Sequence, residues 1–136
     1  MLCVALGVSS FACSVPNLET PECTEARQAV KEFYSYHFGN DMHFTPENLA
    51  AREKFLTPEF AASLKSKQTG GDVFTTGTDD FPKAFRVGGC EVDPQGATSV
   101  EILLFWKTDV RSEQRAIHVH AVKRGDYWLV DNISGQ

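Results

Sequence analysis

The last third of the chain limits the fold most strongly, because it predicts three successive β-strands. β-branched and aromatic residues crowd this stretch, which contains both tryptophans, a composition typical of strands packed into a sheet. The segments between the strands are short, and Gly125-Asp126 fits a two-residue hairpin turn. We expect these strands at Thr98–Thr108, Gln114–Lys123 and Tyr127–Ile133.

A fourth strand is expected upstream, over Ala84–Val92. Gly88-Gly89 interrupts it and predicts a β-bulge. The turn residues of Asp93–Gly96 then return the chain into the next strand. Before these strands, Lys67–Pro82 is rich in glycine, threonine and aspartate. We interpret it as a loop with at most one short strand, around Asp72–Thr75.

The N-terminal half contains three helix starts of the same kind. A Thr-Pro-Glu sequence begins at Thr20, Thr45 and Thr57. Threonine caps free amides, proline suits the first helical position, and glutamate lies at the positive end of the helix dipole. The expected helices are Pro21–Phe38, Pro46–Phe55 and Pro58–Ser66. The fold class is therefore α+β, with three N-terminal helices packed on a curved, mostly antiparallel four-stranded sheet.

An inner pocket between the first helix and the sheet is one candidate site. Tyr34 and His37 lie on an apolar helical stripe, and strand alternation assigns Trp106 and Asn132 to the inner face of the sheet. A mostly apolar pocket with few polar anchors fits ligand binding at least as well as chemistry. The alternative is that Tyr34 and His37 are core residues with satisfied polar tips.

The outer face of the sheet is the second candidate. With Lys107 placed opposite Ala116, this face combines apolar side chains with a cross-strand pair of His120 and Asp131. An imidazole beside a carboxylate suits acid–base or metal chemistry. No third ligand is apparent, and the alternatives are a stabilising surface pair or a dimer interface. The interface candidates are Leu103, Phe105, His118, His120 and Asp131.

The cysteines and the first residues favour export. Residues 1–13 are apolar and small, too few for a membrane span, and similar to the end of a secretory signal, so residues 1–19 are interpreted as a leader. The alternative is an apolar tail. Cys3 and Cys13 lie in this leader, whereas Cys23 and Cys90 lie on separate elements without CxxC spacing. We predict a Cys23–Cys90 disulfide, as exported domains often have; the alternative is two buried free thiols.

Composition and motifs exclude several functions. The net charge is −5, and no run of basic residues is longer than Lys123-Arg124, which argues against nucleic acid and anionic membranes as partners. An N-terminal lipid anchor is the one membrane contact we retain. The chain has no GxSxG, HExxH, P-loop or GxGxxG sequence. No catalytic residue, metal or cofactor is therefore assigned.

Several stretches resemble a known superfamily. Cys23–Tyr34, Arg52–Pro58, Leu103–Trp106 and the closing strand Tyr127–Ile133 are similar to the nuclear transport factor 2-like (cystatin-like α+β cone) superfamily. Within it, they look like an uncharacterised bacterial family of exported or lipid-anchored proteins. The resemblance implies one cone-shaped domain over residues 20–136. Its enzymes are dehydratases and ketosteroid isomerases, and its other members bind small molecules, form dimers or bind proteins.

The sequence thus predicts an exported domain, periplasmic or secreted, that binds a small apolar ligand or a protein partner without catalysis. A homodimer is part of this prediction. One alternative is a pocket enzyme of the isomerase or dehydratase kind, using Tyr34, His37 or Asn132. The other is a periplasmic inhibitor or immunity-type protein that acts through the outer face.

Overall fold

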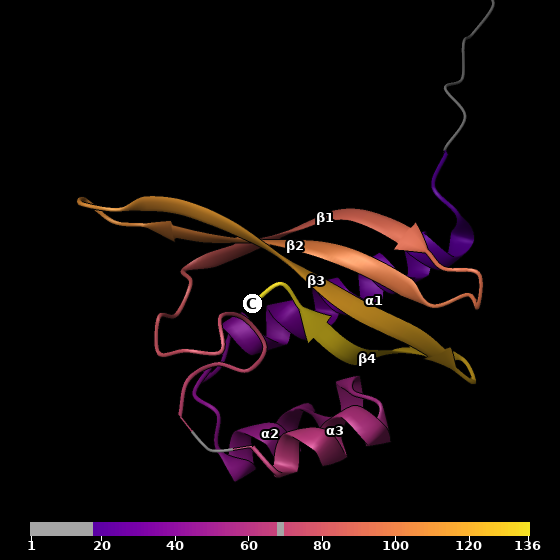
Figure 1. Ribbon diagram of the computed structural model, residues 1–136, viewed down its shortest axis with the longest axis horizontal. Helices are drawn as coiled ribbons and strands as arrows, with labels where there is room; N and C mark the ends of the chain where they lie inside the picture. The colour runs from indigo at the N-terminus through magenta and orange to yellow at the C-terminus, as the bar shows by residue number, and fades with distance from the viewer. Residues whose placement is uncertain (1–17, 68–69) are drawn as a thin grey trace, which may run out of the picture.

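Three helices precede a four-stranded antiparallel sheet, as the computed structural model shows (Figure 1). The structure describes residues 18–67 and 70–136, so residues 1–17 of the predicted leader, with Cys3 and Cys13, lie outside the described residues. Strand order follows the sequence, which confirms the predicted fold class. The elements are α1 (Pro21–Phe38), α2 (Pro46–Arg52), a 3₁₀ turn (Glu53–Phe55), α3 (Pro58–Lys65), β1 (Ala84–Val92), β2 (Thr98–Lys107), β3 (Ser112–Arg124) and β4 (Tyr127–Ser134).

The three predicted helix starts are all present. The hydroxyl of Thr20 accepts a hydrogen bond from the third helical amide of α1, and Thr45 and Thr57 do the same for α2 and α3. Proline follows each cap, at a position whose N–H would have no partner within the helix, so the missing N–H costs no hydrogen bond. The second helix is shorter than expected, because its last turn tightens into the 3₁₀ turn Glu53–Phe55.

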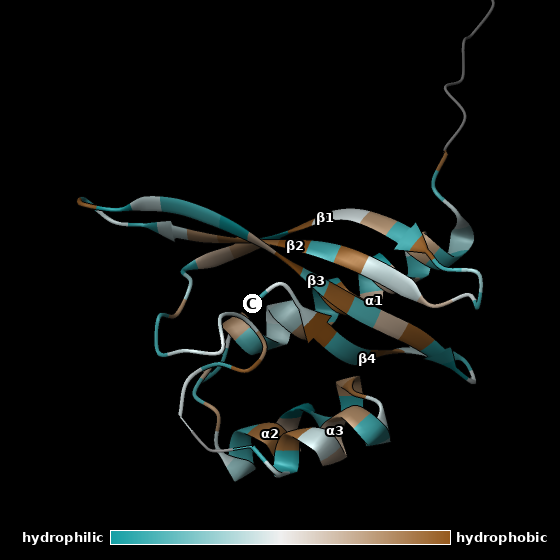
Figure 2. Ribbon diagram, in the orientation of Figure 1, coloured by the Kyte–Doolittle hydropathy of each residue, from teal (hydrophilic) through white to brown (hydrophobic). Residues whose placement is uncertain are grey.

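The core lies between α1 and one face of the sheet. α1 contacts all four strands, whereas α2 and α3 lie beside β4 (Figure 1). Side chains along β2 alternate between buried and half-buried as far as Trp106, and the last residue, Lys107, is exposed. Bands of opposite hydropathy alternate along the strands in Figure 2. The buried face of the sheet is formed mainly by Val100, Ile102, Leu104, Trp106, Ile117, Val119, Ala121 and Val130.

The register of the β2–β3 hairpin differs from the prediction. Lys107 pairs with Ser112 rather than with Ala116, so the hairpin is longer and its tip extends past the other strands (Figure 1). The longer pairing is stabilised on the inner face, where the guanidinium groups of Arg111 and Arg115 lie 5.0 and 5.1 Å from the ring centre of Trp106. The shift is an even number of residues, so the predicted faces of β2 and β3 are retained.

A bulge in β4 reverses the predicted faces of its last residues. Ala121 pairs with Val130 as expected, but His120 pairs with Asn132, which leaves Asp131 as the extra residue. The predicted His120–Asp131 pair is therefore wrong. Asp131 instead accepts a 2.8 Å hydrogen bond from the hydroxyl of Thr57, and this contact fixes the bulge. Beyond it, Asn132 is exposed rather than on the inner face.

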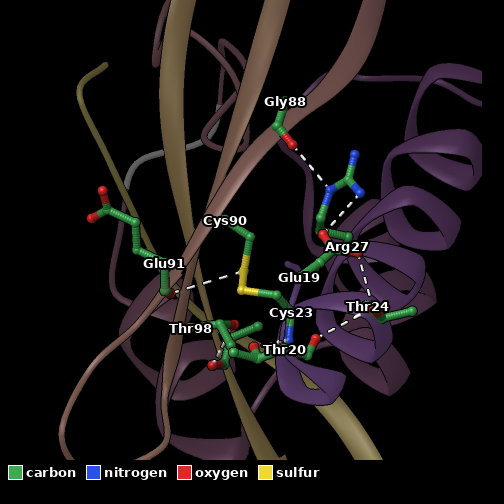
Figure 3. The surroundings of a disulfide bond; sticks show 10 residues. Glu19, Thr20, Cys23, Thr24, Arg27, Gly88, Cys90, Glu91 and Thr98 are labelled. Carbon is green, nitrogen blue, oxygen red and sulfur yellow. Dashed lines mark hydrogen bonds and ion pairs between the residues drawn. A yellow bond between two sulfur atoms is a disulfide. The ribbon is translucent and has the colours of Figure 1, made fainter. Parts of the chain in front are cut away.

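The predicted disulfide joins α1 to β1 (Figure 3). Cys23, in the first turn of α1, is bonded to Cys90, and their Cα atoms are 5.7 Å apart. The predicted bulge lies just before Cys90, where the pairing of β1 with β2 shifts between Val87 and Cys90. A Cβ on Gly88 would lie 2.5 Å from a carboxylate oxygen of Glu101, so a larger residue at this position would require the flexible Glu101 side chain to move.

Candidate functional site

A network of buried polar side chains lies against the C-terminal half of α1. His37 on α1 and Asp72 in the loop before β1 are both almost fully buried, and His37 Nε2 lies 2.9 and 3.0 Å from the two carboxylate oxygens of Asp72. On the other side of the ring, Arg52 Nε donates to His37 Nδ1 over 2.8 Å. Three segments far apart in the sequence therefore meet through one imidazole.

Asp72 also organises its own loop. Its carboxylate accepts hydrogen bonds from the amide of Phe74 (2.9 Å) and the hydroxyl of Thr75 (2.6 Å). The hydroxyl of Tyr34 donates to the carbonyl of Phe74 over 2.7 Å. Each of these buried polar groups therefore has a hydrogen-bond partner within the protein, which it needs because water does not reach it. The loop that the sequence predicts as irregular is thus attached firmly to α1.

The network is unsuited to proton transfer. Arg52 can only donate, so His37 Nδ1 is an acceptor and His37 Nε2 carries the proton donated to Asp72. Both ring nitrogens are therefore hydrogen-bonded to other side chains of the protein. Burial lowers the pKa of Arg52, while burial and the nearby Asp72 charge raise the pKa of Tyr34 well above its ordinary value. The positive charge of Arg52 and the negative charge of Asp72 compensate each other.

An open groove lies along the N-terminal half of α1. It has a volume of about 470 Å³ and runs between α1, the 3₁₀ turn and the β3–β4 hairpin. Apolar side chains dominate its lining and charged groups stand at its rim. The apolar members are Ala29, Val30, Phe55, Ala121, Tyr127, Trp128, Leu129 and Val130, and the polar members are Glu25, Gln28, Glu32, Lys54, Lys123 and Asp126.

Two polar contacts shape the rim of this groove. The carboxylate of Glu25 accepts hydrogen bonds from the indole N–H of Trp128 (2.8 Å) and from Lys123 Nζ (3.3 Å). These bonds, with the positive charge of Lys123, hold the pKa of Glu25 below its usual value. Opposite, Lys54 Nζ lies 5.2 and 5.1 Å from the ring centres of Tyr36 and Phe55. The groove thus combines an apolar floor with fixed charges of both signs.

The predicted pocket residues do not line this groove. Tyr34 and His37 belong to the buried network. Trp106 is buried beneath Arg111 and Arg115, and its indole N–H has no acceptor among the described residues. Asn132 is on the outer side, opposite His120. The structure therefore does not bring these four residues together around one cavity.

The predicted outer-face residues occupy two different places. Leu103 and Phe105 are half-buried on the outer face of β2, where Arg86 from β1 lies 5.8 Å from the Phe105 ring centre. His118 pairs with Glu101, and His120 Nε2 lies 3.1 Å from the hydroxyl of Ser134. Asp131 is the exception, because the bulge directs its carboxylate to Thr57.

In residues 18–67 and 70–136, no three His, Cys, Asp or Glu side chains are placed to share a metal ion. None of the helices in the same residues is long and apolar enough to cross a membrane.

Asp72 and the groove are the features that sequence reasoning missed. A buried aspartate can be suspected where glycines and threonines surround it, since Asp72 follows Gly70-Gly71 and precedes Thr75-Thr76. Its partners, however, are far away in the sequence.

Comparison with known proteins gives a fold but no activity. No protein-family model and no curated protein matches this chain. Its structure is similar to that of a protein of unknown function from Bacteroides thetaiotaomicron. That likeness has a TM-score of 0.51 at 18% sequence identity and covers 82% of this chain and 89% of the other. At this identity the likeness shows a shared fold alone.

Proposed function

We propose that this chain is an exported, non-catalytic binding domain of the nuclear transport factor 2-like class, and that the groove beside α1 is its binding site. The observation that supports this most is the apolar floor of the groove, which is open to ligands and anchored by Glu25, Lys54 and Lys123. A concave, largely apolar surface with a few fixed polar groups is typical of ligand sites.

The interior chemistry supports binding over catalysis. An isomerase or dehydratase needs an acid or base that reaches its substrate. The interior histidine, His37, has both nitrogens engaged by Arg52 and Asp72. The carboxylates that line the groove stand at its rim, and Glu25 is already engaged by Trp128 and Lys123. This arrangement favours holding a ligand rather than transferring its protons.

The disulfide supports the proposed location. Disulfides persist mainly in oxidising compartments, and the Cys23–Cys90 bond ties the first turn of α1 to β1. Together with the apolar residues 1–19, it favours a periplasmic or secreted protein. A free-thiol assay on protein purified from the compartment of synthesis tests this; reduced Cys23 and Cys90 would argue against export.

Binding in the groove can be tested with anilinonaphthalene sulfonate, an apolar anion that fluoresces when bound. We expect saturable binding to the unmodified protein and quenching of Trp128, which lines the groove. Ala29→Trp fills the groove from α1 and should abolish the signal. Ala62→Trp, on the exposed face of α3, is the matched control and should bind normally. Equal binding by both variants would contradict the groove as the site.

A second candidate function is dimerisation through the outer face of the sheet. It is favoured by the half-exposed apolar side chains of Leu103 and Phe105 on a face that the described helices do not cover. Sedimentation at micromolar concentration should then show two chains, and Phe105→Glu should give one. Val110→Glu, at the 95% exposed hairpin tip, should leave the dimer intact. A monomeric unmodified protein would refute this candidate.

A further inference from the structure

The edge of β4 that borders the groove already accepts one extended segment. The amide of Thr57 donates to the carbonyl of Val130 over 2.9 Å, and Leu56 forms a parallel bridge with Val130. The backbone groups of alternate residues in a strand point to the same side. Trp128 therefore presents its N–H and C=O to this same edge, two residues before Val130.

The backbone of Trp128 is open at this edge. Among the described residues, no backbone or side-chain group hydrogen-bonds to its N–H or C=O on that side. The reason is the 3₁₀ turn Glu53–Phe55, which carries the chain away from β4 immediately before Leu56. The groove occupies the place that a longer strand would have filled. Its lining includes the consecutive residues Tyr127, Trp128 and Leu129, as expected where a strand contributes its edge rather than one face.

We propose that the groove receives an extended polypeptide segment of a partner protein, which adds to the edge of β4 next to Leu56 and hydrogen-bonds to the backbone of Trp128. This inference rests on the proposed function, because it names the occupant of the same groove. Strand addition derives affinity from main-chain bonds and specificity from alternate side chains. The existing Leu56–Thr57 contact shows that this edge can pair in that way.

The lining of the groove defines the chemistry of the segment. Alternate side chains of an added strand would face α1, where Ala29, Val30 and Phe55 offer an apolar surface. Glu25 is engaged by Lys123 and Trp128. Glu32, Asp126 and Lys54 also line the groove, and none of them forms an ion pair with any residue in the described part of the chain, so unpaired carboxylates outnumber the unpaired ammonium group. The segment should therefore carry alternate apolar residues and a basic residue beside them.

The test uses random seven-residue peptides displayed on phage and selected against the full chain. Selection on the unmodified protein should enrich peptides with alternating apolar residues and a Lys or Arg. Selection on Ala29→Trp should not enrich them, whereas Ala62→Trp should. The enriched sequences are then synthesised, and their affinity is measured by titration. If the unmodified protein enriches nothing beyond Ala29→Trp, the inference is overturned.

Main-chain pairing is tested by N-methylating each amide of an enriched peptide in turn. Because successive amides of a strand face opposite sides and Trp128 offers one carbonyl, methylation should weaken binding by about tenfold, one hydrogen bond, at the one amide that donates to Trp128, and methylation of its two neighbours should be tolerated. Amide exchange at Trp128 should also slow when the peptide binds. Affinity that is unchanged by methylation at every position would overturn strand addition.

The two proposals fail differently. If anilinonaphthalene sulfonate binds the groove but no peptide does, the groove remains a ligand site and the polypeptide inference alone is wrong. If neither binds, both proposals fall.

Discussion

The two halves of α1 have opposite surroundings: one half is buried against a loop, and the other borders an open groove. Its C-terminal half carries His37, which is buried and hydrogen-bonded to Arg52 on one side and to the loop residue Asp72 on the other. Its N-terminal half carries Glu25 and Ala29, which border an open groove. The closed half places charges where water cannot reach, and the open half keeps its charges at a hydrated rim. This difference indicates that the interior polar groups stabilise the fold, and it is the reason why we propose the open half as the binding site.

The closed half should be the more sensitive to substitution. Asp72→Ala leaves the guanidinium of Arg52 without its compensating charge and the N–H of His37 without an acceptor. Removing one member of a buried ion pair typically costs about 3–5 kcal/mol. We expect a loss of that size in the free energy of unfolding, measured by urea denaturation.

Asp79→Ala provides the control from the same loop. Asp79 is exposed, and substitutions at such positions usually change stability by no more than about 0.5 kcal/mol. A loss at Asp72 as small as that at Asp79 would contradict the stabilising role of the network and weaken the contrast between the two halves.

The features that the sequence predicted well depend on local chemistry. Thr20, Thr45 and Thr57 cap their helices through amides three residues away, so a short window of sequence contains the whole interaction. The faces of β2 and β3 were also predictable, because alternation survives an even error in register. The disulfide was predictable in part because assigning Cys3 and Cys13 to a predicted leader left Cys23 and Cys90, which lack CxxC spacing, as the remaining pair.

The features that the sequence did not reveal depend on distant partners. The bulge at Asp131 is fixed by Thr57, 74 residues earlier, and the burial of Asp72 depends on His37, 35 residues earlier. No periodicity within a strand or loop contains such information. The same reason applies to the groove, which exists because the 3₁₀ turn Glu53–Phe55 diverges from β4. Distant contacts therefore placed the candidate site beyond prediction.

The disulfide should have the next largest effect. The double variant Cys23→Ala/Cys90→Ala lacks the covalent bond between two residues that are 67 positions apart. Removal of such a disulfide typically lowers the free energy of unfolding by about 2–4 kcal/mol. The free energy of unfolding should fall by this amount. Reductant should lower the stability of the unmodified protein to the same level and leave the double variant unchanged. A reductant effect on the double variant would contradict this assignment.

Tyr34→Phe should have a smaller effect, confined to the closed half. It removes the hydroxyl that donates to the buried carbonyl of Phe74, and an unsatisfied buried acceptor costs about 1–3 kcal/mol. Binding of anilinonaphthalene sulfonate in the groove should not change. Tyr127→Phe, at an exposed position that lines the groove, should leave stability unaltered. Weaker probe binding by Tyr34→Phe with unaltered stability would show that the two halves are coupled.

The smallest effect concerns pH at the open half. The bonds from Trp128 and Lys123 lower the pKa of Glu25 from 4.5. A carboxylate with a lowered pKa stabilises the folded state above its unfolded pKa, and that contribution disappears as pH falls through the folded value. In Trp106→Phe, whose one tryptophan is Trp128, the fluorescence should therefore change with a midpoint below the usual pKa of a glutamate side chain. Glu25→Gln should abolish this transition, and high salt should move the midpoint upward because it screens Lys123. A transition of the same midpoint in Glu25→Gln would show that the indole of Trp128 reports another group, and that the rim of the groove is not organised around Glu25.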